Sequence, residues 1–174
     1  AGTVRSRPSP IRSASPEASA SMTSPPENRD LTVITTHMNA DFDAMASMLA
    51  AQKLYPEALA VFPGSQEKNL RNFFINAMVY LFNMADIGDI DFNRVRRLVL
   101  VDTRQPGRIG RFVDLVGRPG VEIHVYDHHP LMENDIRGDV EHCRLTGATV
   151  TILSELIRKK RIELTPDEAT VMCL

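Results

Sequence analysis

The sequence predicts an α/β fold, a three-layer domain with a mostly parallel sheet and helices on both faces. After residue 30, β-branched apolar runs alternate with stretches of helical periodicity. Hairpin signals between these runs are scarce, which favours parallel strands with crossover helices. The run RLVLV at 97–101 is almost continuously apolar, as expected for a parallel strand that is buried on both faces.

Composition and charge narrow the class of protein. The chain has 174 residues, of which 43% are hydrophobic, so it suits one domain with a real core. A formal net charge of −2 excludes a generally basic nucleic-acid coat, although not a local basic groove. No apolar run approaches the roughly 18 residues that cross a bilayer. Cys143 and Cys173 have no disulfide or metal spacing, so we expect reduced thiols and a cytoplasmic protein.

The chain divides into a leader and a domain. Residues 1–29 are rich in Ser, Pro, Arg and Ala without apolar periodicity, which predicts a disordered leader. A transit peptide is the alternative for this segment, although its prolines oppose an amphipathic helix. Residues 30–174 are expected to form the domain. Because the chain stops inside the apolar segment TVMCL, we expect the domain to be incomplete at its carboxyl end.

The first half of the domain predicts a strand, a helix, a short strand and a long helix. Leu31 to Thr36 is a β-branched run, and the Ala- and Met-rich stretch 43–54 is helical up to Pro56. Residues 58–62 form a short apolar run closed by a Pro-Gly turn. Apolar residues at helical spacing in 66–83 predict an amphipathic helix.

The second half alternates in the same way. Residues 97–101 and 121–126 predict strands, 139–144 an edge strand, and 108–116 and 149–160 helices. His124 alternates with the apolar residues of its strand, and we interpret it as a structural residue. A last helix begins at Thr165, because Thr165 and Glu168 have the spacing of a capping box.

Polar residues follow three of the predicted strands directly. They are His37, Asp41 and Asp43 in the spacing H-x-x-x-D-x-D, then Asp102, then Asp127, His128 and His129. The carboxyl ends of parallel strands share one edge of a sheet, so these side chains are expected to meet. Imidazole and carboxylate groups suit a hard or borderline divalent cation. Each motif alone could be a helix cap or a turn, but their recurrence at successive strand ends predicts one metal site.

Phosphate-binding glycine loops are missing from the sequence. Neither G-x-G-x-x-G nor G-x-x-x-x-G-K-[ST] follows the first strand. Dinucleotide-binding and ordinary nucleoside-triphosphate modules are therefore poor fits.

Three segments resemble a known family. THMNADFDAMAS, LVDTR and YDHHP are similar to successive motifs of the DHH phosphoesterase superfamily, over roughly residue 31 to the end. That superfamily includes family II inorganic pyrophosphatases, exopolyphosphatases, single-strand-specific exonucleases, oligoribonucleases and cyclic-dinucleotide phosphodiesterases. FPGSQEKNLRNFF, VDTRQPGRIGRF and DIRGD most resemble a subgroup in which the DHH module precedes paired CBS domains and a tRNA nucleotidyltransferase (poly(A) polymerase-like) domain.

The resemblance implies a two-metal phosphoesterase that hydrolyses a phosphodiester or phosphoanhydride, either a nucleotide or a short oligonucleotide. The implied roles are His37 and Asp41 on the first ion, Asp43 and His128 on the second, Asp102 bridging both, Asp127 orienting the histidine pair and His129 facing the phosphate. Mn²⁺ is the implied ion, with Mg²⁺ or Co²⁺ as alternatives. A fourth motif with another aspartate is expected beyond Leu174, so we expect this fragment alone to be weakly active or inactive.

Two other functions stay open. The chain could be a nucleotide- or RNA-binding accessory domain of a tRNA nucleotidyltransferase fusion, with no independent catalysis and with tRNA bound through the missing carboxyl-terminal domains. It could also be a metal-stabilised fold without turnover.

Three residues are candidates for substrate binding. Arg104 follows the proposed bridging aspartate and could steer an anion, although a solvated helix face is an equal interpretation. Thr146 and Gly147 precede a helix whose amides could hold a phosphate. Ordinary N-capping by Thr146 is the equal alternative.

Overall fold

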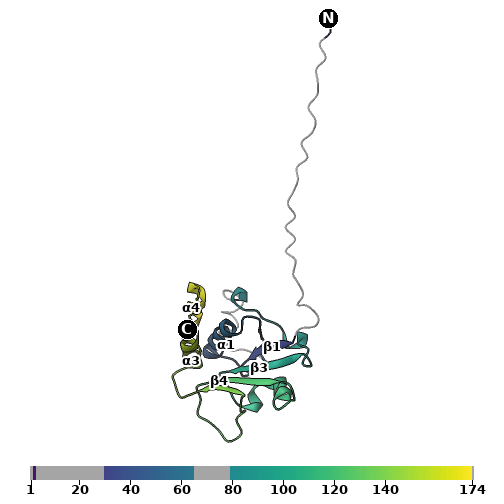
Figure 1. The fold of residues 1–174 in the computed structure, drawn as a ribbon, viewed down its shortest axis with the longest axis vertical. Coiled ribbons are helices and arrows are strands. Elements are labelled where there is room, and N and C mark those ends of the chain that lie inside the picture. Colours follow the sequence, from purple (N-terminus) through teal and green to yellow (C-terminus); the bar gives the residue numbers. More distant parts are fainter. Residues whose placement is uncertain (1, 3–29, 65–78, 174) are drawn as a thin grey trace.

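The computed structural model describes residue 2, residues 30–64 and residues 79–173. It contains one sheet of parallel strands in the order β2-β1-β3-β4-β5 (Figure 1). The strands are β1 (Leu31–Thr35), β2 (Leu59–Ala60), β3 (Val95–Val101), β4 (Glu122–Asp127) and β5 (Val140–Cys143). The expected α/β class with its parallel sheet is confirmed. The expected leader, and the expected helix over 66–83 apart from its last residues, lie outside the described residues.

The centre of the sheet is apolar, as the sequence predicted. Residues 98–101 of β3 are completely buried, because helices or loops cover both sides of this strand. Val99 of β3 lies between Ile34 of β1 and His124 of β4 in the ladder. β5 forms the expected edge next to β4.

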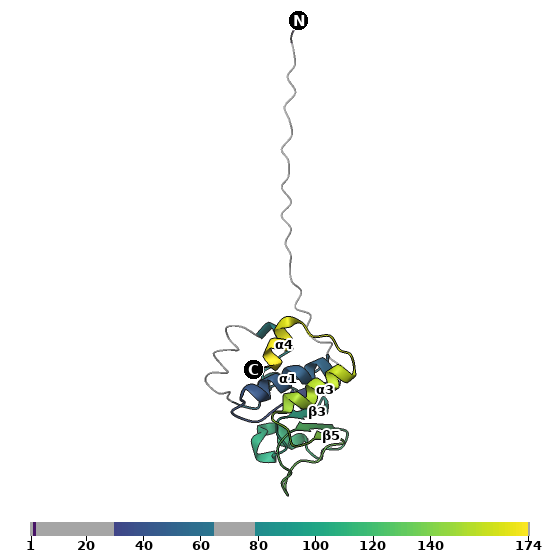
Figure 2. The ribbon, with the colours of Figure 1, turned by 90° about the vertical axis from the view of Figure 1, so that its left-hand side faces the viewer.

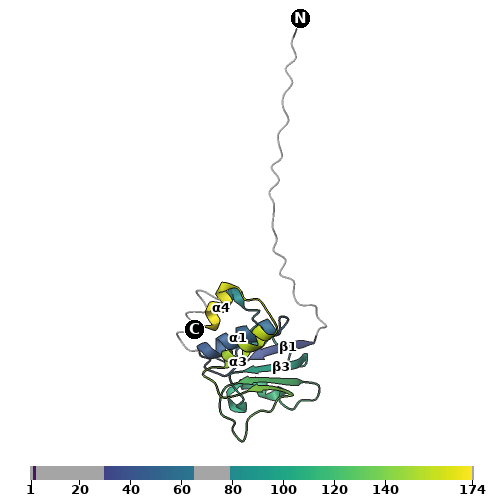
Figure 3. The ribbon, with the colours of Figure 1, turned by 60° about the vertical axis from the view of Figure 1, so that its left-hand side comes forward.

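In the described part of the chain, the α-helices lie on one side of the sheet (Figures 2 and 3). They are α1 (Phe42–Leu54), α3 (Thr149–Lys159) and α4 (Pro166–Met172). α1 packs against β1, β3 and both other helices, so its residues 44–52 are all buried. Alanine and methionine suit such a helix, since small and flexible side chains allow neighbours to approach on every side. Met45, Met48 and Leu49 share one core with Val99 and Leu153.

On the opposite face, the helical segment expected at 108–116 takes the form of short 3₁₀ helices. They are η4 (Pro106–Arg108) and η5 (Gly110–Leu115), which bury Phe112 and Leu115 against the sheet. Gly110, the first residue of η5, has a φ of 55°, a left-handed conformation that an α-helix cannot continue through. A side chain there would also meet the Pro63 carbonyl, 3.1 Å from the position of a Cβ atom. Gly110 and the packing around it therefore favour 3₁₀ turns over a continuous α-helix in this segment.

The last predicted helix is confirmed together with its cap. The Thr165 hydroxyl accepts a hydrogen bond from the Glu168 amide at 3.3 Å, and the Glu168 carboxylate accepts one from the Thr165 amide at 2.8 Å. Lys53 of α1 donates to the same carboxylate at 2.9 Å. These contacts join α4 to α1.

Among the described residues, the short 3₁₀ helices η2 (Val79–Leu81) and η3 (Ile87–Asp89) precede β3. Within 30–64 and 79–173, every helix is too short or too polar to cross a membrane.

Candidate metal centre

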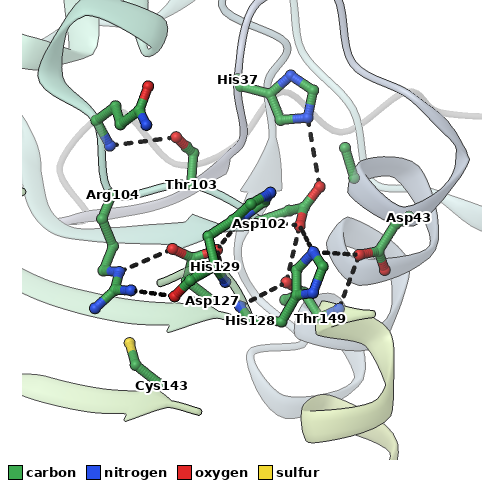
Figure 4. Close-up of polar contacts among 12 residues, drawn as sticks. His37, Asp43, Asp102, Thr103, Arg104, Asp127, His128, His129, Cys143 and Thr149 are labelled. Carbon is green, nitrogen blue, oxygen red and sulfur yellow. Dashed lines mark hydrogen bonds and ion pairs between the residues drawn. The ribbon is translucent and has the colours of Figure 1, made fainter. Parts of the chain in front are cut away.

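The carboxyl ends of β1, β3 and β4 meet at one edge of the sheet and bring the predicted polar residues together (Figure 4). Donor atoms of His37, Asp41 and Asp102 lie within 4.8 Å of one another, and so do those of Asp102, His128 and His129. Asp102 belongs to both groups. Asp43 adjoins the second group, with its Oδ2 atom 3.7 Å from Nε2 of His128.

Asp102 stands between two imidazoles. Its Oδ2 atom lies 3.4 Å from Nε2 of His37, and its Oδ1 atom lies 3.4 Å from Nε2 of His128. The residue is 2% exposed. Its φ of 59° is left-handed, which costs a residue with a Cβ atom roughly 1 kcal/mol or more. Strained backbone of this kind is concentrated at functional sites.

Backbone carbonyls fix the direction of both imidazoles. Nδ1 of His37 lies 2.9 Å from the Met38 carbonyl, and Nδ1 of His128 lies 2.9 Å from the Thr146 carbonyl. Because a carbonyl only accepts, each Nδ1 must carry the proton. In the neutral form of either ring, Nε2 is then the unprotonated nitrogen, and it is the atom that faces Asp102. This is the arrangement that orients histidine ligands of metal ions.

Asp41 and Asp43 are held at helix amino ends. Oδ1 of Asp41 accepts from the Ala44 amide at 3.0 Å and caps α1. The Asp43 carboxylate accepts from the Thr149 and Val150 amides of α3, at 2.8 and 3.0 Å, where the helix dipole favours negative charge. These α3 amides thus hold Asp43, whereas a phosphate or the Thr146 side chain was the predicted partner.

The cluster has the electrostatics of a cation site. Burial and the neighbouring charge of Asp102 raise the pKa of Asp43 above its ordinary value. Burial lowers the pKa of His37, but the imidazolium form is stabilised by a hydrogen bond from Nε2 to Asp102 and by the Met38 carbonyl, and together these leave the pKa raised. The Asp102 carboxylate contributes to both shifts, because its negative charge disfavours ionised Asp43 and favours protonated His37. A bound cation would offset this charge.

Arg104 and Asp127 form a buried ion pair, and both residues hydrogen-bond to His129. Oδ1 of Asp127 accepts from Nδ1 of His129 at 2.7 Å, and Oδ2 accepts from Nε of Arg104 at 2.8 Å. Nη2 of Arg104 also donates to the His129 carbonyl at 2.6 Å. Arg104 is only 5% exposed, so the structure places its guanidinium inside the protein and not on an open binding face. His129 is the most exposed imidazole of the cluster, with 43% of its side chain accessible.

The loop before α3 has a different role from the one that the sequence predicted. The N-cap of α3 is Ala148, whose methyl side chain cannot accept a hydrogen bond, so Thr146 does not cap this helix. Instead, the Thr146 carbonyl holds His128, and Gly147 beside it is exposed.

The sequence reasoning missed Thr149 as a site residue. Its hydroxyl is buried and donates to Oδ1 of Asp102 at 2.9 Å. In the sequence, a threonine at a helix start indicates only a cap. Nothing in the sequence distinguishes Thr149 from a threonine that only begins a helix.

Fold and site together define a parallel α/β domain with a carboxylate–imidazole centre at the carboxyl edge of its sheet. The family model described as "DHH family, N-terminal domain" matches residues 31–174, and the chain belongs to the DHH family. Membership supports the hydrolase class in general, since this is a phosphoesterase superfamily with metal-dependent members.

Two curated relatives are A-adding tRNA nucleotidyltransferases. The protein from Geobacter sulfurreducens is 49% identical over 142 residues, 82% of this chain and 16% of the relative. The protein from Aquifex aeolicus is 30% identical over 142 residues, 80% of this chain and 16% of the relative. The chain therefore spans about one sixth of the length of these relatives.

A solved structure shares the fold. An exopolyphosphatase-related protein from Bacteroides fragilis aligns with a TM-score of 0.62 and 17% identity, over 84% of this chain and 45% of that one.

Proposed function

We propose that the chain is a Mn²⁺-dependent two-metal phosphoesterase module that hydrolyses a phosphodiester or phosphoanhydride, in a nucleotide or a short oligonucleotide. One observation carries the proposal. The two oxygens of Asp102 face Nε2 atoms of different histidines, each at 3.4 Å, which is the arrangement expected of a carboxylate that bridges two ions. Membership of the DHH family supports the same chemistry.

The donors divide into two sets around Asp102. His37 and Asp41 would hold the first ion, and Asp43 and His128 the second. His129 is near the second set, but its Nδ1 is already bound to Asp127, so it is less suited as a ligand. Mixed imidazole and carboxylate donors favour Mn²⁺ over the all-oxygen sites of Mg²⁺, and Co²⁺ also fits. Two bound ions would supply an activated water and neutralise charge on the phosphate.

The protein's own contribution is to orient the substrate phosphate. Asp127 accepts a hydrogen bond from Nδ1 of His129, so this ring turns Nε2 outward. From there, a protonated Nε2 would donate a hydrogen bond to a phosphate oxygen as charge develops on it. Asp127 is 1% exposed and acts through His129.

We assign different roles to the other three candidates. The turn of Thr146 and Gly147 holds His128 by a carbonyl and exposes Gly147 next to it, so it would border the substrate. Arg104 would act on Asp127 and the histidine turn instead of on the substrate.

Hydrolysis assays with a matched pair of variants test the proposal. The assay should use the longest protein that the reading frame encodes, with Mn²⁺ and either pyrophosphate, a linear dinucleotide or a cyclic dinucleotide. Asp102→Asn should abolish turnover with the fold intact, whereas the control Asp114→Asn, on the exposed side of η5, should not change it. Wild-type turnover in Asp102→Asn would show that the proposal is wrong.

An accessory role is the second candidate. It is favoured by the 49% identity to a relative named as an A-adding tRNA nucleotidyltransferase. In that case the chain would bind nucleotide or tRNA without hydrolysis, in a cytoplasmic protein. Fluorescence anisotropy with labelled tRNA would detect equal binding by the wild type and Asp102→Asn, together with no Mn²⁺-dependent turnover of the three substrates.

A further inference from the structure

The first turn of α3 touches ligand candidates from three different strand ends (Figure 4). The hydroxyl of Thr149 donates to Oδ1 of Asp102 at 2.9 Å and accepts from the His128 amide at 3.2 Å. The amide of the same residue donates to Oδ2 of Asp43 at 2.8 Å. One residue therefore contacts segments that follow β1, β3 and β4.

The hydrogen bonds of the Thr149 hydroxyl differ from those that a threonine at a helix start usually makes. Such a threonine is commonly the N-cap, and its oxygen accepts from amides of its own helix. Here Ala148 is the N-cap, and Thr149 is the first residue of α3. Its hydroxyl points away from the helix to the ends of β3 and β4, and the residue is completely buried.

The direction of the hydroxyl proton follows from its two partners. An amide can only donate, so the oxygen must accept from His128. The single hydroxyl proton is therefore committed to Asp102, whose carboxylate can only accept. This hydrogen bond fixes Oδ1, the oxygen that faces Nε2 of His128, whereas Oδ2 faces His37.

We propose that Thr149 is a positioning residue of the metal centre, which holds Oδ1 of Asp102 and the His128 turn in the geometry required by the second ion. This inference rests on the proposed two-metal function. Residues that orient metal ligands typically change metal affinity by about 10–100-fold when they are replaced. The effect should fall on the second ion, because the contact is made to the oxygen on that side.

Mn²⁺ titration followed by electron paramagnetic resonance tests the role without any assay of activity. Thr149→Val has a similar volume but no hydroxyl, and it should weaken the affinity of one of the two ions by about tenfold or more. The affinity of the other ion should change by less than about threefold. Thr149→Ser restores the hydroxyl and should bind as the wild type does. The control is Thr151→Val, two residues further along α3 and exposed.

The outcomes separate this inference from the proposed function. If Thr149→Val lowers only the melting temperature and binds Mn²⁺ as the wild type does, Thr149 is a packing residue and the inference is wrong. Equal weakening by Thr149→Ser would also overturn it, because the hydroxyl would then not be the cause. If the wild type itself binds no Mn²⁺, the proposed function fails and this inference fails with it.

Discussion

Nε of Arg104 donates a hydrogen bond to Oδ2 of Asp127 at 2.8 Å, and the two side chains are only 5% and 2% exposed. The same guanidinium reaches the His129 carbonyl, while the Arg104 carbonyl accepts from the Ile136 amide at 2.7 Å. Arg104 thus ties the end of β3 to the histidine turn after β4. A buried ion pair of this kind is costly to break from one side only.

We therefore predict that Arg104→Ala lowers the free energy of unfolding by about 3–5 kcal/mol, because it leaves the buried Asp127 carboxylate without its guanidinium partner. The double variant Arg104→Ala/Asp127→Ala should lose clearly less unfolding free energy than the two single variants lose in sum. Urea unfolding of the four proteins measures this coupling. Additive losses, within about 0.5 kcal/mol, would contradict it.

Arg97 and Glu122 provide the matched control. They form an ion pair at 2.7 Å, but their side chains are 39% and 40% exposed. The corresponding double-mutant cycle on Arg97 and Glu122 should give a coupling free energy below about 1 kcal/mol, because solvent screens exposed ion pairs.

Bound metal should stabilise the fold measurably. Mn²⁺ at 100 times its dissociation constant should add about 2.7 kcal/mol to the free energy of unfolding, which is on the order of 8 °C in Tm for a domain of this size. His37→Gln should lose most of this gain because it removes the Nε2 donor. Differential scanning fluorimetry with and without Mn²⁺ measures both effects. His142→Gln, a histidine stacked on Tyr126 in β4, is the control and should keep the full gain.

A second buried polar cluster should matter for stability alone. The Tyr55 hydroxyl lies 2.6 Å from Nδ1 of His124 and 2.6 Å from the Tyr126 hydroxyl. Burial and this neighbour raise the pKa of Tyr126, so its phenol stays neutral. Tyr55→Phe leaves two buried polar groups without this partner and should cost about 1–3 kcal/mol in urea unfolding.

The control for this variant is Tyr80→Phe. Tyr80 is 67% exposed and donates to Asp167 at 3.0 Å. Tyr80→Phe should lower the free energy of unfolding by less than about 0.5 kcal/mol, as is usual for surface substitutions. The Mn²⁺-dependent gain in Tm should survive in both variants, and its loss in Tyr55→Phe would contradict a purely structural role for the cluster.

The sequence was sufficient to predict the sheet and the edge at which polar residues gather. Apolar runs identify buried strands, and in a parallel sheet the residue after each run must lie at the shared carboxyl edge, as His37 and Asp102 do. This argument requires only strand type and chain direction. It therefore works without any knowledge of side-chain orientation.

Hydrogen-bond partners could not be predicted in this way, because tertiary packing decides them. The spacing of Arg104 after Asp102 fits a substrate contact as well as it fits the buried pair with Asp127. Thr149 looks like an ordinary helix start until α3 is placed against the ends of β3 and β4. In 108–116 the helical pattern was real, but Gly110 and the packing of Phe112 selected 3₁₀ turns.

The cap of α4 should make stability depend on pH below about 4.5. Burial raises the pKa of Glu168, but the Thr165 amide and Lys53 outweigh it and leave this pKa below the ordinary value of 4.5. A carboxylate with a lowered pKa stabilises the folded state above the unfolded pKa, and this contribution is lost as the pH falls through the folded pKa. The gap in unfolding free energy between the wild type and Glu168→Gln should therefore be constant above about pH 5.5 and shrink steadily towards pH 3. Glu163→Gln, an exposed glutamate nearby, removes the same charge and should show almost no gap at any pH. A Glu168→Gln gap that persists unchanged at pH 3 would mean that the ionised carboxylate does not contribute to the cap.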